Sequence, residues 1–296
     1  MIKLPSVLSH NPIINQARHS RRRTWRKQAA IVLALISYCP ALLIVFPYII
    51  TNLFFESWEF FVDNLDYFGQ TIFYVTAIFL LVLVTLFAPT MSASTIAGER
   101  QRQTLDLLIV TLLPARSIIT GKLVATLTHT LRLIAIAGPL VVIGLIVGGI
   151  PIIQLIVILL LLLTTAIAFT IIGLFGSSLS RTTTNAVMLT YGLLLPGFLI
   201  GPFLAMLPVT IILNLADVSF QVEETINFYG WSLAASLNPI SAAVYSAILY
   251  EQSNEIFWST ETNYLIFPWV IYIIFYSLMS WLLVRLTIRQ LERIGE

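Results

Sequence analysis

Six charged side chains lie close together in the sequence, on a connection between two long apolar stretches. Five of them flank a central segment that contains Asp106, and these are Glu99, Arg100, Arg102, Arg116 and Lys122. Side chains of both signs on one connection can pair with complementary charges on a second protein. A binding surface for a soluble partner is therefore the chemistry that this part of the chain offers most directly.

The residues between these charges predict a short amphipathic helix. Thr104 has the side chain of a helix N-cap, and Asp106 suits the positive end of the helix dipole. Pro114 predicts the end of the helix. The apolar positions recur at the helical spacing i, i+3, i+4 and i+7, as Leu105, Leu108, Ile109 and Leu112. Such a helix can dock its apolar face into a groove on a partner, or it can lie on the membrane surface and merely connect two spans.

The chain lacks the sequence motifs of an ATPase or a hydrolase. Gly121 and Lys122 are followed by Leu123 and lack the upstream glycine of a phosphate-binding loop. The sequence has no His-Glu-x-x-His motif and no Gly-x-Ser-x-Gly motif. Its three histidines are far apart, so we predict no metal site. We therefore predict that the chain is not an enzyme, has no catalytic residue and binds no cofactor of its own.

The composition of the chain is that of a polytopic membrane protein. Hydrophobic residues make up 58% of the sequence and charged residues only 10%, and the mean hydropathy is +0.93. A soluble domain carries about 25% charged residues. The 296 residues leave little room for a separate soluble domain, so residues 1–296 are predicted to form a single transmembrane domain. The one cysteine excludes a disulfide framework.

We predict an all-α fold with six membrane-spanning helices. A helix needs about 20 apolar residues to cross the hydrocarbon core of a membrane. The stretches that meet this requirement are 29–50, 71–89, 123–147, 152–175, 186–213 and 264–284. The predicted parts of the domain are a basic segment at 1–28, spans one and two at 29–90, a cytoplasmic loop at 91–122, spans three to five at 123–213, an external loop at 214–263, and span six with a cytoplasmic tail at 264–296.

The charges of the connections predict that both termini are cytoplasmic. Seven of the 16 Lys and Arg precede the first span; all but one of the others lie in the loop at 91–122 or after the fourth and sixth spans. The two remaining large connections contain no Lys or Arg but hold ten of the 14 acidic residues. Positive charges collect on the cytoplasmic side of membrane proteins, so the acidic connections are predicted to face outward.

Two connections are predicted to contain helices that do not cross the membrane. Within the basic segment at 1–28, residues 11–27 predict an interfacial helix on the inner leaflet, or a charge cluster that only fixes the orientation. Residues 229–250 are apolar, but Asn238 and Pro239 interrupt this stretch at its centre. We favour two short re-entrant helices in the outer leaflet over a seventh span, because a seventh span would move the C-terminal arginines outside.

Two sets of residues within or beside the apolar stretches are candidates for a further role. His129 and Arg132 share one helix face at the spacing i, i+3, and ionisable side chains at membrane depth are commonly functional. Arg132 can instead extend to the inner membrane surface, because the uninterrupted apolar run begins only at residue 133. Pairs of glycines four residues apart let helices approach closely, and these are Gly144 with Gly148 and Gly197 with Gly201.

The loop at 91–122 also resembles the cytoplasmic loop of type-2 ABC transporter permeases. The resemblance rests on Glu99, Arg100, Thr104, Leu105, Asp106, Leu108, Pro114, Gly121 and Lys122. A weaker match lies at Asn11 and Pro12, and Gln103 stands where the family usually has glycine.

This resemblance implies the integral permease subunit of an ABC exporter with the type-2 fold, in which the segment 99–122 contains the coupling helix. The implied partners are cytoplasmic ABC ATPase subunits that bind ATP and Mg, a second copy or a paralogue of the permease, and membrane lipid, but no nucleic acid. The first and fifth spans are the implied contact between permeases. The implied location is a bacterial-type cytoplasmic membrane.

Two other classes of protein are the alternatives. One is a stand-alone secondary transporter or channel, and the other is a membrane scaffold that recruits a soluble partner through the same loop. The predicted spans contain no acidic residue, which disfavours a proton- or cation-coupled transporter.

Overall fold

The computed structural model describes residues 65–104, 114–200, 207, 211, 229–253 and 268–295, and the regular elements in these ranges are all helices. The elements are α5 (Leu65–Gln101), α7 (Ala115–Val147), α8 (Ile152–Leu179), α9 (Thr183–Leu195), the π-helix η2 (Pro196–Ile200), α12 (Pro239–Ser253) and α13 (Pro268–Gly295). Residues 229–236 are also helical. The prediction of an all-α protein is confirmed for the part of the chain that the structure describes.

Four of the described helices are long and apolar enough to cross a membrane. They are α5, α7, α8 and the part of α13 at Pro268–Glu292, and they contain the predicted second, third and fourth spans and most of the sixth. The predicted first span at 29–50 lies outside the described residues. The predicted fifth span is described only in part, as α9, η2 and two isolated helical residues. Six spans therefore stay a prediction.

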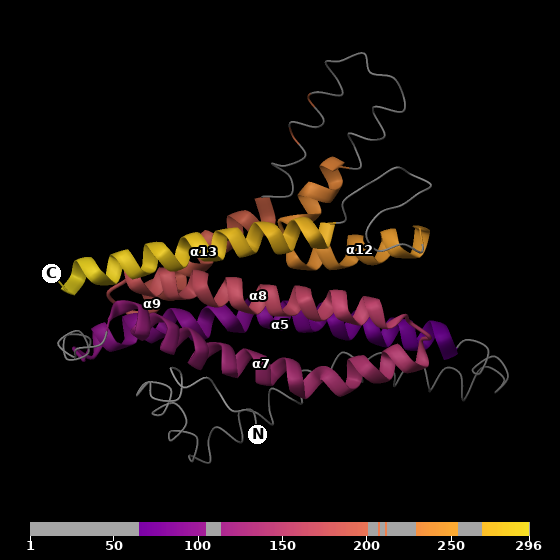
Figure 1. The fold of residues 1–296 in the computed structure, drawn as a ribbon, viewed down its shortest axis with the longest axis horizontal. Helices are drawn as coiled ribbons and strands as arrows, with labels where there is room; N and C mark the ends of the chain where they lie inside the picture. The colour runs from indigo at the N-terminus through magenta and orange to yellow at the C-terminus, as the bar shows by residue number, and fades with distance from the viewer. Residues whose placement is uncertain are drawn as a thin grey trace.

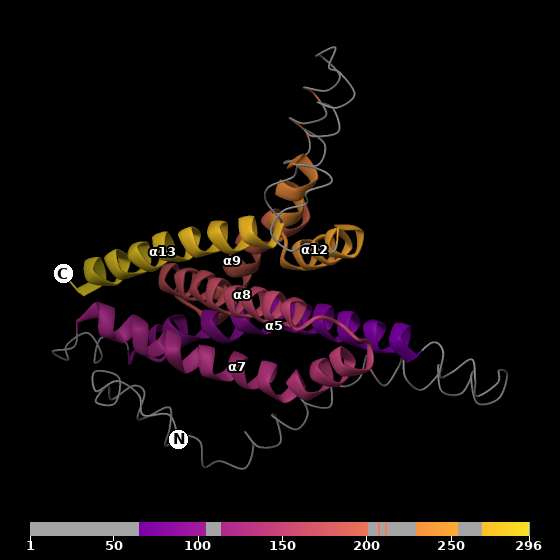
Figure 2. The same ribbon diagram turned by 45° about the vertical axis from the view of Figure 1, so that its right-hand side comes forward.

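The helices form a bundle with α5 and α8 at its centre. Figures 1 and 2 show these two helices side by side, with α7 on one side and α13 on the other. Within the most apolar part of each helix, 56% of the residues of α5 and of α8 are buried, compared with 28% for α7 and 22% for α13. The outer faces of α7 and α13 are therefore the apolar surfaces that the bundle offers to lipid or to another subunit.

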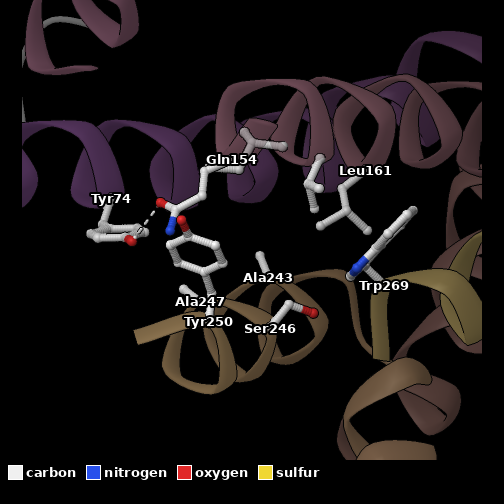
Figure 3. Close-up of a pocket in the computed structure, with 10 residues that line it drawn as sticks. Tyr74, Gln154, Leu161, Ala243, Ser246, Ala247, Tyr250 and Trp269 are labelled. Carbon is white, nitrogen blue, oxygen red and sulfur yellow. Dashed lines mark hydrogen bonds between the residues drawn. The ribbon is translucent and has the colours of Figure 1, made fainter. Parts of the chain in front are cut away.

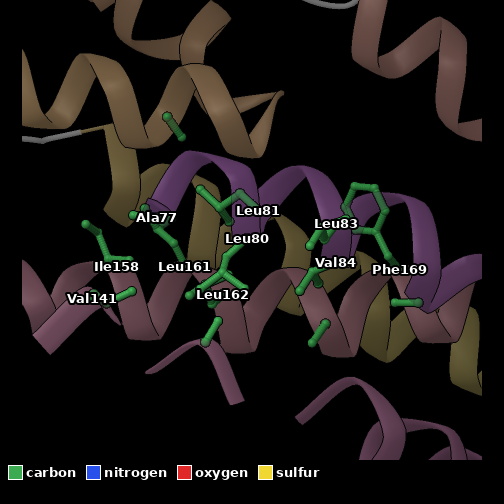
Figure 4. Close-up of a cluster of buried hydrophobic side chains, with 14 of the residues drawn as sticks. Ala77, Leu80, Leu81, Leu83, Val84, Val141, Ile158, Leu161, Leu162 and Phe169 are labelled. Atoms are coloured by element: carbon green, nitrogen blue, oxygen red, sulfur yellow. The ribbon is translucent and has the colours of Figure 1, made fainter. Parts of the chain in front are cut away.

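The core between the central helices is made of closely packed aliphatic side chains. Figure 4 shows Leu80, Leu81 and Val84 of α5 among Leu161 and Leu162 of α8. All five side chains are almost completely buried. Because lipid tails are as apolar as leucine, close packing rather than the removal of apolar surface from water holds such helices together in a membrane.

Two helices extend well beyond the predicted spans. The predicted second span ended at Pro89 and the third began at Leu123, whereas α5 continues to Gln101 and α7 already begins at Ala115. The 37 residues of α5 make a helix about 55 Å long, compared with a hydrocarbon core about 30 Å thick. Much of the predicted loop at 91–122 is therefore helical. Its small polar residues end the apolar stretch, but they do not end the helix.

Glycines bring α5 and α7 into close contact at the end of the bundle that contains Gly69 and Val147. A Cβ atom on Gly144 would lie 2.8 Å from the backbone nitrogen of Phe73, and one on Gly148 would lie 2.6 Å from that of Gln70. Gly144 and Gly148 thus pack against another helix of the same chain. Around Gly197 nothing lies within 4 Å of such an atom, and Gly201 lies outside the described residues.

A break separates the helix at 229–236 from α12, as Asn238 and Pro239 predicted. The side chain of Asn238 accepts a hydrogen bond from the backbone N–H of Ile240 at 2.9 Å. The hydroxyl of Tyr276 on α13 donates to the carbonyl oxygen of Leu237 at 2.7 Å. Backbone groups at such a break need partners inside the protein if the break lies at membrane depth, and these contacts supply them. Location of both helices in the outer leaflet stays a prediction.

Candidate functional site

The structure brings Glu99 and Lys122 together where α5 ends and α7 begins. Lys122 Nζ lies 2.7 Å from Glu99 Oε2, and the two side chains are 35% and 6% exposed for Glu99 and Lys122 respectively. Lys122 Nζ also donates a hydrogen bond to the carbonyl oxygen of Thr95 at 3.0 Å. Lys122 is the one charged side chain that is buried among the described residues. A buried ammonium needs an opposite charge and hydrogen-bond acceptors, and both come from the last turns of α5.

A Schellman motif that begins at the carbonyl oxygen of Glu99 ends α5. The backbone N–H of Thr104 donates to the Glu99 carbonyl oxygen at 3.0 Å, and that of Gln103 donates to the Arg100 carbonyl oxygen at 3.1 Å. Gln103 has φ 58, the left-handed conformation that this motif requires and that glycine adopts most easily. The glycine usual at this position in type-2 permeases therefore has a physical reason, and Gln103 adopts the same turn.

Thr104, which was predicted to be the N-cap of the following helix, is also part of the C-terminal turn of α5. Its hydroxyl donates to the Glu99 carbonyl oxygen at 3.2 Å. The predicted amphipathic helix itself lies outside the described residues, which exclude 105–113 and with them Leu105, Asp106, Leu108, Ile109 and Leu112.

The chain is described again from Pro114, which is the N-cap residue of α7. The Pro114 carbonyl oxygen accepts a hydrogen bond from the backbone N–H of Ser117 at 2.8 Å. Gly121 and Lys122 are buried in the second turn of this helix. The predicted end of the amphipathic helix at Pro114 therefore coincides with the start of α7.

The turn between α8 and α9 also contacts this end of α5, which sequence reasoning missed. Arg100 Nη1 donates to the carbonyl oxygen of Ser180 at 2.9 Å. Gln101 Oε1 accepts hydrogen bonds from the backbone N–H and the hydroxyl of Thr183, at 3.3 and 3.1 Å. Arg100, one of the motif residues, therefore attaches the end of α5 to the end of α8.

A serine of α8 makes a second contact that the sequence did not reveal. Ser177 Oγ accepts hydrogen bonds from the backbone N–H groups of Ile96 and Ala97 on α5, at 3.0 and 2.8 Å. The signal in the sequence was the run of small residues at 176–178, at the end of an otherwise apolar span. Small residues of this kind mark places where membrane helices pack closely.

A polar hollow of about 940 Å³ lies beside the end of α5. It is lined by Ser94, Thr95, Gly98, Glu99, Gln101, Arg102, Thr104 and Thr183. The lining residues come from α5, its C-terminal turn and the start of α9. A hollow of this size with a polar lining suits side chains of another protein, and it includes Glu99 of the ion pair.

An apolar pocket at the other end of the bundle is too small for a transported molecule. Figure 3 shows it between α5, α8, α12 and Trp269, with the Tyr74 hydroxyl donating to Gln154 Oε1 at 2.8 Å. Its volume is about 30 Å³, which is the space of about one water molecule. The described residues therefore form no substrate-sized pocket here.

The predicted polar pair His129 and Arg132 lies on α7, the less buried neighbour of α5. His129 is exposed and Arg132 is half-buried. The buried cation of this helix is Lys122 instead. Among the described residues no group of His, Cys, Asp and Glu is arranged to hold a metal ion.

Long apolar helices, four of which can span a membrane, define the chain as a multi-pass α-helical membrane protein. The family described as ABC-2 family transporter protein matches residues 11–286. The chain therefore belongs to this family, the type-2 ABC transporter permeases. A search of curated proteins found no match. As a permease of this family, the chain is the membrane subunit of an ABC transporter, and the partner that this implies is an ATP-binding subunit.

Proposed function

We propose that this chain is the permease subunit of an ATP-driven exporter and that separate ATPase subunits bind its segment 99–122. Two permease subunits, either two copies of this chain or this chain and a paralogue, enclose the substrate path. ATP and Mg²⁺ bind to the ATPase subunits. ATP-driven closure of those subunits moves the segment, and the segment moves the membrane helices.

The ion pair between the half-buried Glu99 and the buried Lys122 is the observation that carries this proposal. The connection between Gln101 and Ala115 is 13 residues long, and it can transmit a displacement only if both of its ends are firmly attached. Glu99 lies in the last turn of α5 and Lys122 in the second turn of α7, and their contact joins the two ends. Through Arg100 and Ser180 the same displacement also reaches α8. A push on the connection therefore acts on three helices together.

The proposed membrane arrangement follows the charge pattern of the sequence. Six spans place both termini and the segment 99–122 in the cytoplasm, in a bacterial-type cytoplasmic membrane. Residues 1–28 lie at the inner interface, and the helix at 229–236 and α12 lie in the outer leaflet. The Tyr276 hydroxyl supports this placement, because it satisfies the Leu237 carbonyl oxygen at the break.

Purification of the tagged chain together with its native genomic neighbours tests the proposal. We expect an ATP-hydrolysing subunit to elute with the wild-type chain in a stoichiometric amount, because the ATPase binds the segment directly. Leu108→Glu places a charge on the predicted apolar face and should remove the ATPase without changing the size-exclusion profile of the permease. A stable chain that elutes without ATPase activity would contradict the proposal and favour a secondary transporter.

A pair of variants separates coupling from stability. Glu99→Gln leaves the Lys122 ammonium buried without an opposite charge and should lower the free energy of unfolding by about 1–3 kcal/mol, because Glu99 itself is only half-buried. The double variant Glu99→Gln with Lys122→Met removes the buried charge and should recover most of that loss. If the pair transmits motion, the double variant still binds the ATPase but loses substrate-linked ATP hydrolysis. If the double variant kept normal substrate-linked ATP hydrolysis, the role of Glu99 and Lys122 would be structural only.

A further inference from the structure

A second charged surface lies at the same end of the bundle, between the start of α7 and the end of α13. It is a groove of about 650 Å³, and three exposed arginines line it. Arg116 belongs to α7, whereas Arg285 and Arg289 are one helical turn apart on α13. Glu292 also lines the groove, so three positive charges face one negative charge. The groove is formally cationic, and it shares no residue with the hollow beside Glu99.

The remaining lining of the groove is largely apolar. It consists of Ile171, Ser280, Trp281, Val284 and Ile288. Ile171 is buried on the central helix α8. Ile288 also packs against a buried cluster of Ile118 and Ile119 of α7 and Leu291 of α13, which joins the two helices. The groove therefore has a charged part and an apolar part, as the binding site of an amphiphile does.

Trp281 holds one of the arginines in position. The guanidinium carbon of Arg285 lies 3.7 Å from the centre of the Trp281 ring. A guanidinium stacked on an aromatic face keeps its N–H groups in its own plane, where they can donate to a phosphate. Tryptophan and arginine are also the residues that collect where a membrane helix meets the headgroup layer. These residue types are therefore the ones expected at the depth of lipid phosphates.

We propose that this groove binds an anionic phospholipid from the adjacent leaflet. The lipid phosphate contacts Arg116, Arg285 and Arg289, and an acyl chain lies along Ile171 and Val284. Arginine pairs with phosphate oxygens through two N–H groups at once. The charges of the groove are complementary to an anionic headgroup. A free phosphate ion can contact the arginines but not the apolar part, so the groove favours a lipid over free phosphate. Arginines that only set the orientation of the chain would not need to gather from two helices around one groove.

Lipid binding by the purified full-length chain in an uncharged detergent tests this proposal. The probes are phosphatidylglycerol, phosphatidylcholine and inorganic phosphate, and the measurements are the shift in Tm and the lipid retained in native mass spectrometry. We expect phosphatidylglycerol alone to raise the Tm and to remain bound. The combined variant Arg116→Gln, Arg285→Gln and Arg289→Gln should weaken this binding on the order of 100-fold, because each arginine near anionic lipid contributes a factor of about five.

Arg181→Gln is the matched control, because Arg181 is exposed at the same end of the bundle but does not line the groove. It should bind phosphatidylglycerol as the wild-type chain does. Val284→Trp fills the apolar part and keeps all three arginines, so this variant should also lose the lipid. It tests the proposal if the triple variant does not fold. An equal Tm shift with inorganic phosphate, an equal loss in Arg181→Gln, or tighter binding of an acidic peptide than of phosphatidylglycerol would overturn the proposal.

Discussion

Glu99 and Lys122 are the pair of residues on which the proposed coupling depends most directly. They are 23 positions apart in the sequence, yet their charged groups are 2.7 Å apart. Replacing a buried ion pair with apolar residues is often neutral for stability, whereas removing one partner is strongly destabilising. Stability alone therefore does not explain a lysine at this buried position. The proposed role in transmitting movement does explain it.

At the residue scale, Gln103 offers a test that is free of packing effects because its side chain is exposed. Its left-handed backbone, φ 58, costs an ordinary residue about 1–2 kcal/mol. Gln103→Gly should therefore raise the free energy of unfolding by about 1 kcal/mol, and Gln103→Val should lower it, since a β-branched residue tolerates this conformation poorly. Thermal unfolding of the purified chain measures both changes. If both variants had the same Tm as the wild-type chain, the Schellman end of α5 would be in doubt.

At the scale of elements, contacts between small residues decide how the helices fit together. Gly69, Gly144 and Gly148 let α5 and α7 approach until their backbones touch. Gly173 of α8 similarly lies against the Pro89 carbonyl oxygen of α5, which a Cβ atom would approach to 2.6 Å. The pair Gly144 and Gly148 that the sequence offered for helix contacts is thus used inside the chain.

Two glycines of α7 form a matched pair for testing this packing. Gly144→Ala should lower the free energy of unfolding by about 1–3 kcal/mol, because the new methyl group collides with the backbone of Phe73. A Cβ atom added at Gly138 would have no neighbour within 4 Å, so Gly138→Ala should be neutral or raise stability by up to about 1 kcal/mol. Thermal unfolding in detergent compares the two variants. Equal effects would show that α5 and α7 do not touch at Gly144.

At the scale of the whole molecule, most of the charged residues that the structure describes lie at one end of the bundle, although Asp66 lies at the other. The ion pair of Glu99, the connection after α8 and the arginine groove all lie there, whereas Leu65 and Val147 mark the opposite end. Both proposed interactions, with an ATPase and with anionic lipid, therefore use the same end of the protein. In the proposed mechanism, lipid bound at the groove would influence the helices that the ATPase moves.

Labelling of single cysteines tests which side of the membrane this end faces. In a Cys39→Ser background, Arg181→Cys reports on the charged end and Tyr67→Cys on the opposite end, where Tyr67 is 71% exposed. A membrane-impermeant maleimide should label Tyr67→Cys in intact cells and Arg181→Cys only after the cells are opened, because positively charged connections stay in the cytoplasm. Labelling of Arg181→Cys in intact cells would reverse the proposed orientation.

The class of the protein and much of its helical layout could be predicted from the sequence. Long apolar stretches specify helices by themselves, since a backbone in lipid must satisfy its own hydrogen bonds. The third predicted span, for example, ends at Val147 as α7 does. The ends of α5 at Gln101 and of α7 at Ala115 were not predicted, because hydropathy detects the membrane span and a helix can continue beyond it into water.

The sequence by itself determined the family, the membrane class and the break at Asn238 and Pro239, because these depend on composition and on local residue patterns. Only the tertiary structure decided that Lys122 is buried against Glu99, that Ser177 accepts two backbone N–H groups of α5, and that arginines of α7 and α13 share one groove. These contacts join residues that are 23 to about 170 positions apart, and nothing in a local pattern specifies which distant helices pack together. Their physical reason is the close fit of particular side chains and glycines across the bundle.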